Sequence, residues 1–362
     1  MATALFLVGF LAAIPKKSKA LNRIFLLLFI GLMILVFSGN NSTPDQISYK
    51  AVYDGYYEAY FEFGYMMITS ALRTISFDYT QFKIVVAVIV VIMMKFRFRD
   101  VGSRVWSLSL VFWVLSSFWV EIEQSRFYIA MVIVLFATRY LEDKTVTNMF
   151  KYVLFVFVAM QFHTSAAFYL LMVVIFVPNY QKIRIFIFMT FLTVSLISLV
   201  CNNDWSFLGE ILYSATKNER VLFWFGMRTN FGYIGPLFVQ LIIYTLLSYN
   251  EKVMRIYYHR IGSCEKEKIS LCYTSKKISE VLFLAVPLYM ISTDFIRIER
   301  GFLLLFFLST FQCFKYMDFK QKALSCSLLI ALIIVFNLIC YGNIIPIANP
   351  YFGNMLLYND WN

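Results

Sequence analysis

The chain has 362 residues, of which 60% are hydrophobic and 15% charged, and its mean hydropathy is +0.71. Soluble globular proteins carry about 45–50% apolar and about 25% charged residues. Because the apolar excess runs along the whole length, composition excludes a soluble domain, with or without a single anchor. The basic residues behind the net charge of +11 fall in short loops between apolar runs, which excludes a nucleic-acid-binding face. The six cysteines show no metal-ligand spacing, so we expect no disulfide, metal or cofactor.

Apolar runs of about 15–20 residues predict membrane-spanning helices. The first run is read as a short span because its lysines follow it, whereas those of a signal peptide precede it. About twelve spans are expected, near 2–14, 21–38, 77–94, 104–121, 124–141, 148–162, 164–178, 184–201, 231–249, 278–293, 299–317 and 323–343. The spans at 148–162 and 164–178 are short, which predicts that they are tilted or broken around His163. The expected fold is all-α, a single polytopic integral membrane domain over 1–362.

Charge sorts the loops into two sets, and the more basic set is cytoplasmic by the positive-inside rule. That set holds 23 of the 32 basic residues, at Lys16 to Arg23, Lys95 to Arg104, Arg139 to Lys151, Lys182 and Arg184, Lys252 to Lys277, and Lys315 to Lys322. The external set keeps nine: Lys50, Arg73, Lys83, Arg126, Lys217, Arg220, Arg228, Arg297 and Arg300. Both termini then lie outside. The largest external loops are 202–230 and 39–58, and the largest cytoplasmic loop is 250–277.

Parity restricts one further segment. Loop 39–58 is external and loop 95–103 is cytoplasmic, so an odd number of crossings separates them. Segments 59–76 and 77–94 therefore cannot both cross. Segment 59–76 is the more polar, and we predict an interfacial or re-entrant helix there on the external side.

Arg126 and His163 are ionisable residues inside apolar stretches. Such a side chain costs roughly 2.5–3.5 kcal/mol at membrane depth, so it usually faces a cavity or a partner. The plainer alternatives are that Arg126 snorkels to the interface and pairs with Glu123, and that His163 is a kink residue bonded to a backbone carbonyl.

Acidic and tyrosine side chains surround the external arginines. They are Asp45, Asp54, Glu58 and Glu62, Glu121 and Glu123, Glu219, Asp294 and Glu299, with Tyr49, Tyr53, Tyr56, Tyr57, Tyr60 and Tyr65. Arginine binds phosphate in bidentate fashion, so this pattern predicts a ligand with a pyrophosphate, a glycan and a lipid. Alternatively Glu62 only fixes the interfacial helix, the tyrosines form an interfacial belt, and Arg297 and Arg300 are ordinary loop charges.

Motifs in this region resemble those of the EpsG family of Wzy-type polysaccharide polymerases. They are Asp45-x-x-x-Tyr49 and Tyr53, Phe61-Glu62-Phe63-Gly64-Tyr65, Ser125-Arg126 with Ile129-Ala130, and Phe162-His163-Thr164-Ser165-Ala166. Asp294, Arg297 and Arg300 fall where such proteins carry a late external arginine, and Asn349-Pro350-Tyr351 resembles their terminal motif. The family usually has an Arg and a Gly before the Asp, but the Arg is missing here, so that phosphate contact is either absent or supplied by Lys50 or Arg73.

The resemblance implies a GT-C-like glycosyltransferase of the bacterial cytoplasmic membrane. It would join undecaprenyl-pyrophosphate-linked repeats into O-antigen, capsule or exopolysaccharide. Arg126, with the late arginines Arg297 and Arg300, would hold the pyrophosphate. His163, Glu62 or Asp45 would position or deprotonate the acceptor hydroxyl. The remaining candidate substrate-binding residues are Tyr49, Tyr53 and Asp294.

The expected partners are the lipid-linked glycan, membrane lipid, a chain-length regulator and a flippase. A rival function is a flippase for the same lipid-linked glycan. Such a transporter should carry a repeat symmetry and charges at mid-membrane, but the sequence shows no repeat. A membrane O-acyltransferase would also carry a histidine, but it needs a route for an acyl donor, of which the sequence gives no sign.

Overall fold

The computed structural model describes residues 2–14, 18–40, 43–56, 61–217, 219–226, 233–260 and 266–342. Within these ranges every regular element is a helix, so the all-α prediction is confirmed there. The chain divides into two compact units that are interleaved in the sequence. Unit 1 is 1–170 with 301–315 and 341–362, and unit 2 is 171–300 with 316–340. That the two form a single membrane domain stays a prediction.

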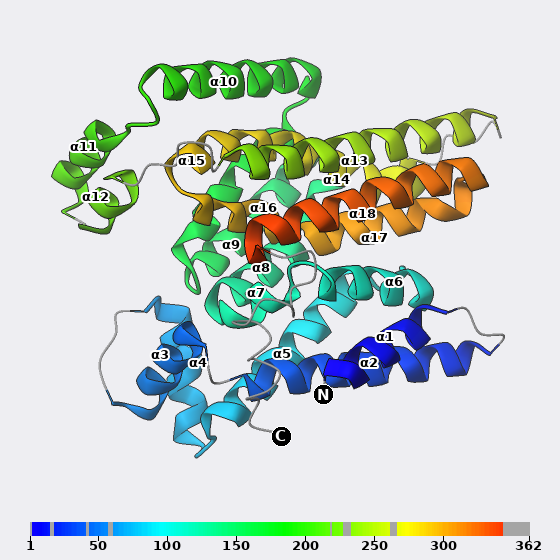
Figure 1. Cartoon of the computed structure of the whole chain (residues 1–362), viewed down its shortest axis with the longest axis horizontal. Coiled ribbons are helices and arrows are strands. Elements are labelled where there is room, and N and C mark those ends of the chain that lie inside the picture. Colours follow the sequence, from blue (N-terminus) through cyan, green and yellow to red (C-terminus); the bar gives the residue numbers. More distant parts are fainter. Residues whose placement is uncertain are drawn as a thin grey trace. The chain divides into compact units, whose positions relative to one another are not determined.

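Unit 1 is built around a helix that is apolar on every side. It contains α1 (Ala2–Ala13), α2 (Lys19–Gly39), α3 (Pro44–Asp54), α4 (Phe63–Thr74), α5 (Tyr79–Arg97), α6 (Ser103–Val114), α7 (Phe118–Glu123), α8 (Ser125–Ala137), η1 (Thr138–Leu141), α9 (Val146–Met160) and α17 (Leu303–Cys313). Helix α8 is buried along nearly its whole length, as expected for a helix with no polar face. It packs against α5, α7 and α9, while α1, α2 and α17 pack on α6 (Figure 1).

Unit 2 is organised by a long helical hairpin. Its elements are α10 (Tyr180–Val200), α11 (Ser206–Thr216), α12 (Glu219–Gly226), α13 (Ile234–Arg260), α14 (Lys266–Leu282), η3 (Phe283–Ala285), α15 (Val286–Ile291), η4 (Thr293–Ile296), α16 (Arg297–Arg300) and most of α18 (Phe319–Tyr341). The 3₁₀ segments η2 (Thr164–Phe176) and η5 (Phe314–Tyr316) continue the chain between the units. Helices α13 and α14 lie side by side in Figure 1, and Gln240 donates across the hairpin to the Ser279 carbonyl at 2.6 Å.

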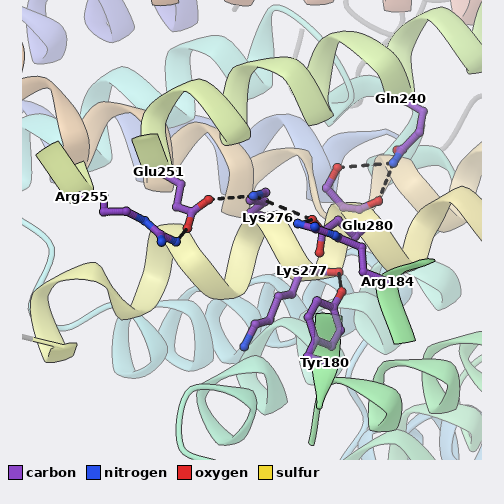
Figure 2. Close-up of polar contacts among 9 residues, drawn as sticks. Tyr180, Arg184, Gln240, Glu251, Arg255, Lys276, Lys277 and Glu280 are labelled. Carbon is purple, nitrogen blue, oxygen red and sulfur yellow. Dashed lines mark hydrogen bonds and ion pairs between the residues drawn. The ribbon is translucent and has the colours of Figure 1, made fainter. Parts of the chain in front are cut away.

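A network of ion pairs holds the charged end of this hairpin (Figure 2). Glu251 of α13 pairs with Lys276 of α14 at 2.7 Å and also with Arg255 on its own helix. Lys276 continues to Glu280, which Arg184 of α10 approaches at 3.8 Å. The Glu251 and Glu280 side chains are 8% and 2% exposed, and each of these buried carboxylates has two cationic neighbours. This is the pairing that a charge needs inside a fold.

The network corrects one part of the sequence interpretation. Residues 250–260 and 266–277 are helical rather than loop, because α13 continues to Arg260 and α14 begins at Lys266. Charge density suggested a solvated loop, but Glu, Lys and Arg are good helix formers. Val253, Met254 and Tyr258 give the extension of α13 a buried apolar face. Loops 39–58 and 202–230 likewise contain helices, namely α3 in the first and α11 and α12 in the second.

Four helices are long and apolar enough to cross a membrane, among the residues described: α2, α5, α10 and α18. Of the other predicted spans, 231–249 falls largely within α13, a 27-residue helix that is not among the four, and the rest are shorter or divided. Span 104–121 breaks between α6 and α7, and span 278–293 is divided among α14, η3 and α15. The break expected around His163 is present, since α9 ends at Met160 and η2 begins at Thr164. Helix α4 has 12 residues, about 18 Å, which is shorter than a hydrocarbon core of about 30 Å.

Candidate functional site

A buried glutamine fixes the helix break that precedes Arg126. The Gln46 side chain of α3 donates to the carbonyls of Ile122 and Glu123 at 3.0 and 2.7 Å, and it accepts from the Tyr79 hydroxyl at 2.8 Å. The last carbonyls of a helix have no partner within it, so Gln46 satisfies two such groups at the end of α7. Helix α8 starts two residues later, and Arg126 lies in its first turn.

Gly64, in the motif that contains Glu62, allows the start of α4 to touch the end of α9. The Gly64 and Tyr65 amides donate to the Gln161 carbonyl at 2.8 and 3.3 Å. A Cβ atom at position 64 would lie 2.8 Å from that same carbonyl oxygen, closer than such atoms approach. Glycine is therefore required by the close backbone approach. This contact brings the Glu62 motif to the motif that contains His163.

Arg126 and Glu62 form the centre of the site. An Arg126 guanidinium nitrogen lies 2.5 Å from one Glu62 oxygen, and the other Glu62 oxygen accepts from the Thr164 amide at 3.2 Å. The two side chains are 17% and 16% exposed, so the pair is accessible from one side. Arg126 thus pairs with Glu62, 64 residues away in sequence, whereas the snorkelling alternative expected Glu123 as its partner. The carboxylate connects the starts of α8 and η2.

Aromatic rings enclose the guanidinium of Arg126. Its Cζ atom lies 4.0 Å from the centroid of the Phe61 ring and 5.1 Å from that of Tyr49. Tyr65 packs against both rings, with centroid distances of 5.7 and 6.0 Å. Cation–π contacts of this kind stabilise a partly buried arginine by about 0.5–2 kcal/mol without using its N–H donors. The donors therefore remain able to bind an anion.

Buried polar atoms without a hydrogen-bond partner gather beside this arginine. They are Nε of Arg126, the Tyr65 hydroxyl and the Ser125 hydroxyl, none of which has a partner among the described residues. Burial, and next the neighbouring Tyr49, raise the pKa of Tyr65 well above its usual value, so its hydroxyl stays protonated. Buried polar groups are normally satisfied; the Tyr65 hydroxyl lies near those of Ser125 and Tyr79, so Nε of Arg126 is the atom here with capacity for a polar ligand.

His163 lies in the break between α9 and η2. Its Nδ1 atom is 2.7 Å from the Ser165 hydroxyl and 3.3 Å from the Ser165 amide. Its ring meets the Phe127 ring edge-on, with the two centroids 5.5 Å apart, and Phe127 directly follows Arg126. The kink expected from the sequence is present, and the imidazole is held by a side chain and an amide rather than by a carbonyl alone.

The other predicted residues of unit 1 lie around this centre. Asp45 occupies the first turn of α3, directly before Gln46. Tyr53 is 3% exposed, donates to the Phe77 carbonyl at 2.8 Å and packs on Tyr79. These contacts give Tyr53 a structural role, and its role in binding substrate stays a prediction. Tyr57, Tyr60 and the motif at 349–351 lie outside the described residues.

The late arginines belong to unit 2. Arg297 donates through Nε to the Asp294 carbonyl at 2.9 Å, and its guanidinium lies 3.6 Å from the Asp294 carboxylate. Arg300 is 4% exposed, and the buried carboxylate of Glu299 accepts from Tyr289 at 3.1 Å. Asp294 and Arg297 thus form a local pair in the turn of η4 and α16, and their role in binding substrate stays a prediction.

Two residues of the site were missed by sequence reasoning. Gln46 was passed over because 39–58 was read as a loop, although Gln46, Tyr49 and Tyr53 share one helical face. Lys83 was counted only as an external charge, but it is 1% exposed and donates to the Asn40 carbonyl at 2.5 Å. In the described part of the chain, no three His, Cys, Asp or Glu side chains form a group that could hold a metal.

Comparison with known protein families supports the family that the motifs indicated. A model of the EpsG family matches residues 24–359, nearly the whole chain. The chain belongs to the EpsG family. Members of the EpsG family are Wzy-type polymerases, so the resemblance drawn from the motifs is confirmed, and the chain belongs to a family of membrane polysaccharide polymerases. No curated protein and no solved structure matches the chain significantly. The contact between the Glu62 motif and the His163 motif is therefore read directly from this EpsG-family structure.

Proposed function

We propose that the protein joins undecaprenyl-pyrophosphate-linked oligosaccharide repeats into O-antigen, capsular or exopolysaccharide chains on the external face of the bacterial cytoplasmic membrane. The family match supports the class of reaction. The observation that carries the proposal is the Arg126–Glu62 pair at 2.5 Å, partly exposed and flanked by aromatic rings. The pair places an arginine, which can bind phosphate through two N–H groups, beside a carboxylate that can act as a base.

The reaction needs both groups. The acceptor hydroxyl oxygen attacks the anomeric carbon of the donor glycan, and the bond from that carbon to the pyrophosphate oxygen breaks. The electron pair leaves with undecaprenyl pyrophosphate, and the hydroxyl proton passes to a carboxylate. Arg126 stabilises the charge that develops on the leaving pyrophosphate. When phosphate oxygens replace Glu62 as the partner of Arg126, the Glu62 carboxylate is released to take the proton.

Two neighbours support these roles. The Thr164 amide already donates to Glu62, so the carboxylate remains oriented when its bond to Arg126 is exchanged. His163 is held through Nδ1 by Ser165, and its ring lies edge-on to Phe127, the residue after Arg126, which suits it to position a hydroxyl of the acceptor. Asp45 is the alternative base. The partly exposed ring of Phe61 offers the stacking surface that sugar rings use.

Reconstitution in liposomes tests the proposal. The full-length protein would be supplied with lipid-linked repeats extracted from its own host, and polymer ladders and released undecaprenyl pyrophosphate would be measured. We expect both products to form together and Arg126→Ala to abolish both. The matched control is Arg97→Ala, which breaks the ion pair to Glu142 in the same unit and should lower protein yield but not activity per molecule. Movement of the lipid-linked glycan across the membrane without release of pyrophosphate would establish the flippase function instead.

A further inference from the structure

Unit 1 contains an apolar cavity of about 200 Å³ between α2, α5 and α6, closed at one end by Phe118 and Tyr128. A cavity that holds one water needs only about 10–15 Å³, and large apolar cavities stay dry and take up apolar ligands. Leu27 lines it and is 68% exposed, so the cavity opens on the outer side of α2. Because α2 is a candidate membrane span, that side faces lipid.

One charged residue lies at the other end. Among the described residues that line the cavity, Lys95 alone is charged, and its Nζ atom lies 6.0 Å from the centroid of the Trp106 ring. The neighbouring Arg97 is engaged with Glu142 and Thr138. The cavity is therefore amphipathic along its length, with a cation at the last turn of α5 and hydrocarbon-like walls beyond it.

The length of the cavity matches one leaflet. On α2 its lining runs from Leu26 to Phe37, twelve residues that span about 16 Å of helix. Half of a hydrocarbon core is about 15 Å. A single acyl chain of a membrane phospholipid fits this depth, whereas the chain of a long polyprenyl carrier would extend far beyond it. Lys95 belongs to the basic run 95–104 that the charge sorting assigns to the cytoplasmic side, where anionic lipids attract lysine and arginine.

We propose that this cavity binds one acyl chain of an anionic phospholipid from the cytoplasmic leaflet, with the lipid phosphate at Lys95. The headgroup position at Lys95, in the last turn of α5, is separate from the proposed polymerase chemistry, in which the pyrophosphate of the carrier must reach Arg126 at the start of α8. The bound lipid fills the space between α2, α5 and α6 and completes the packing of unit 1.

Native mass spectrometry of the full-length protein in detergent tests the site, with phosphatidylglycerol and phosphatidylcholine of equal chain length as probes. The wild-type protein should retain one phosphatidylglycerol, bound about tenfold more tightly than phosphatidylcholine. Lys95→Gln should remove that preference. The matched control is Arg99→Gln in the same run, whose side chain is 74% exposed and does not line the cavity, and it should keep the preference.

A second variant tests the apolar part. Ala87→Phe places a ring in the cavity and should abolish retention of either lipid. Equal retention of the two lipids by the wild-type protein, or an equal effect of the Lys95 and Arg99 variants, would overturn the proposal. Preferential retention of a polyprenyl phosphate that is insensitive to Lys95→Gln would overturn it in favour of the carrier. Because the readout is lipid binding, none of these results bears on polymerase activity.

Discussion

Two charged clusters in this apolar chain are built in different ways. In unit 2, Glu251 is bound by Lys276 and Arg255, and Glu280 lies near Lys276 and Arg184, so that carboxylates and cations alternate (Figure 2). In unit 1, Arg126 has one carboxylate, Glu62, and is otherwise surrounded by aromatic rings and orphaned polar atoms.

The difference separates a cluster that holds helices together from one that is suited to a ligand. A carboxylate with two cationic neighbours can lose one of them without being left unpaired. A single pair with unused donors can exchange its partner for an anion at small cost, because the aromatic contacts of Arg126 persist through the exchange. Substitutions in the two clusters should therefore affect activity and stability in opposite proportions.

A large effect is expected when the shape of the cation changes but its charge does not. Arg126→Lys should lower the polymerisation rate by one to two orders of magnitude, because an ammonium cannot meet two phosphate oxygens at once. The converse change in unit 2, Lys276→Arg, should leave the rate unchanged. Initial rates of polymer formation, normalised to protein in the membrane, measure both. Equal rates for the two variants would place Arg126 in the same structural class as Lys276.

Gly64→Ala tests the contact that assembles the site. The added Cβ meets the Gln161 carbonyl at 2.8 Å, so α4 must move away from α9 and carry Glu62 away from Arg126. We expect more than a tenfold loss of activity, together with a destabilisation of about 1–3 kcal/mol. Gly102→Ala is the control, since a Cβ there meets nothing within 4 Å. Thermal unfolding in detergent and polymer rate would be measured on both.

His163 should matter for activity more than for folding. His163→Ala should lose activity about 10²-fold, the usual contribution of a positioned acid or base, while its membrane level stays close to wild type. His163→Gln should retain part of the activity if the ring acts only by hydrogen bonding. A packing role predicts the reverse, with reduced protein level in both variants and normal activity per molecule. Quantitative immunoblots and polymer length together distinguish the two roles.

Gln46 is expected to act through Arg126 rather than on substrate. Gln46→Leu leaves the Ile122 and Glu123 carbonyls without their side-chain donor, which costs about 1–3 kcal/mol for a buried group. The first turn of α8 then loses its fixed position, and we expect the rate to fall about tenfold with KM raised. Gln46→Glu, which accepts but does not donate when ionised, should recover function as the pH is lowered. A rate that is independent of pH in that variant would argue against this role.

The smallest effect concerns the pH dependence of stability in unit 2. Burial raises the pKa of Glu251, but hydrogen bonds from Lys276 and Arg255 outweigh it and hold the pKa below its usual value. The ionised pair therefore stabilises the fold above the unfolded pKa of about 4.3, and this contribution is lost as the pH falls through the lower folded value. Glu251→Gln should flatten the dependence of melting temperature on pH between neutral and acid conditions.

Several features were predictable because they depend on local pattern. The helical class follows from apolar runs in a chain that must satisfy its backbone internally within lipid. The break at 161–163 follows from two short runs around His163, and the candidate arginine follows from a charge that lipid does not tolerate. The ordered motifs with Glu62, Arg126 and His163 were enough to indicate the family, and a match over residues 24–359 agrees.

The sequence alone thus determined the helical class, the membrane setting, the family and the residue types of the site. Tertiary structure decided the rest. The partner of Arg126 is Glu62 rather than its neighbour Glu123, because Gly64 allows α4 to touch the carbonyl end of α9. Gln46 matters because its side chain donates to two backbone carbonyls more than 70 residues away. The basic stretch is helical over 250–260 and 266–277, and Lys276 pairs with Glu251 between the two helices. Pairing between distant residues depends on how helices pack, and no local pattern of apolar and charged residues specifies it.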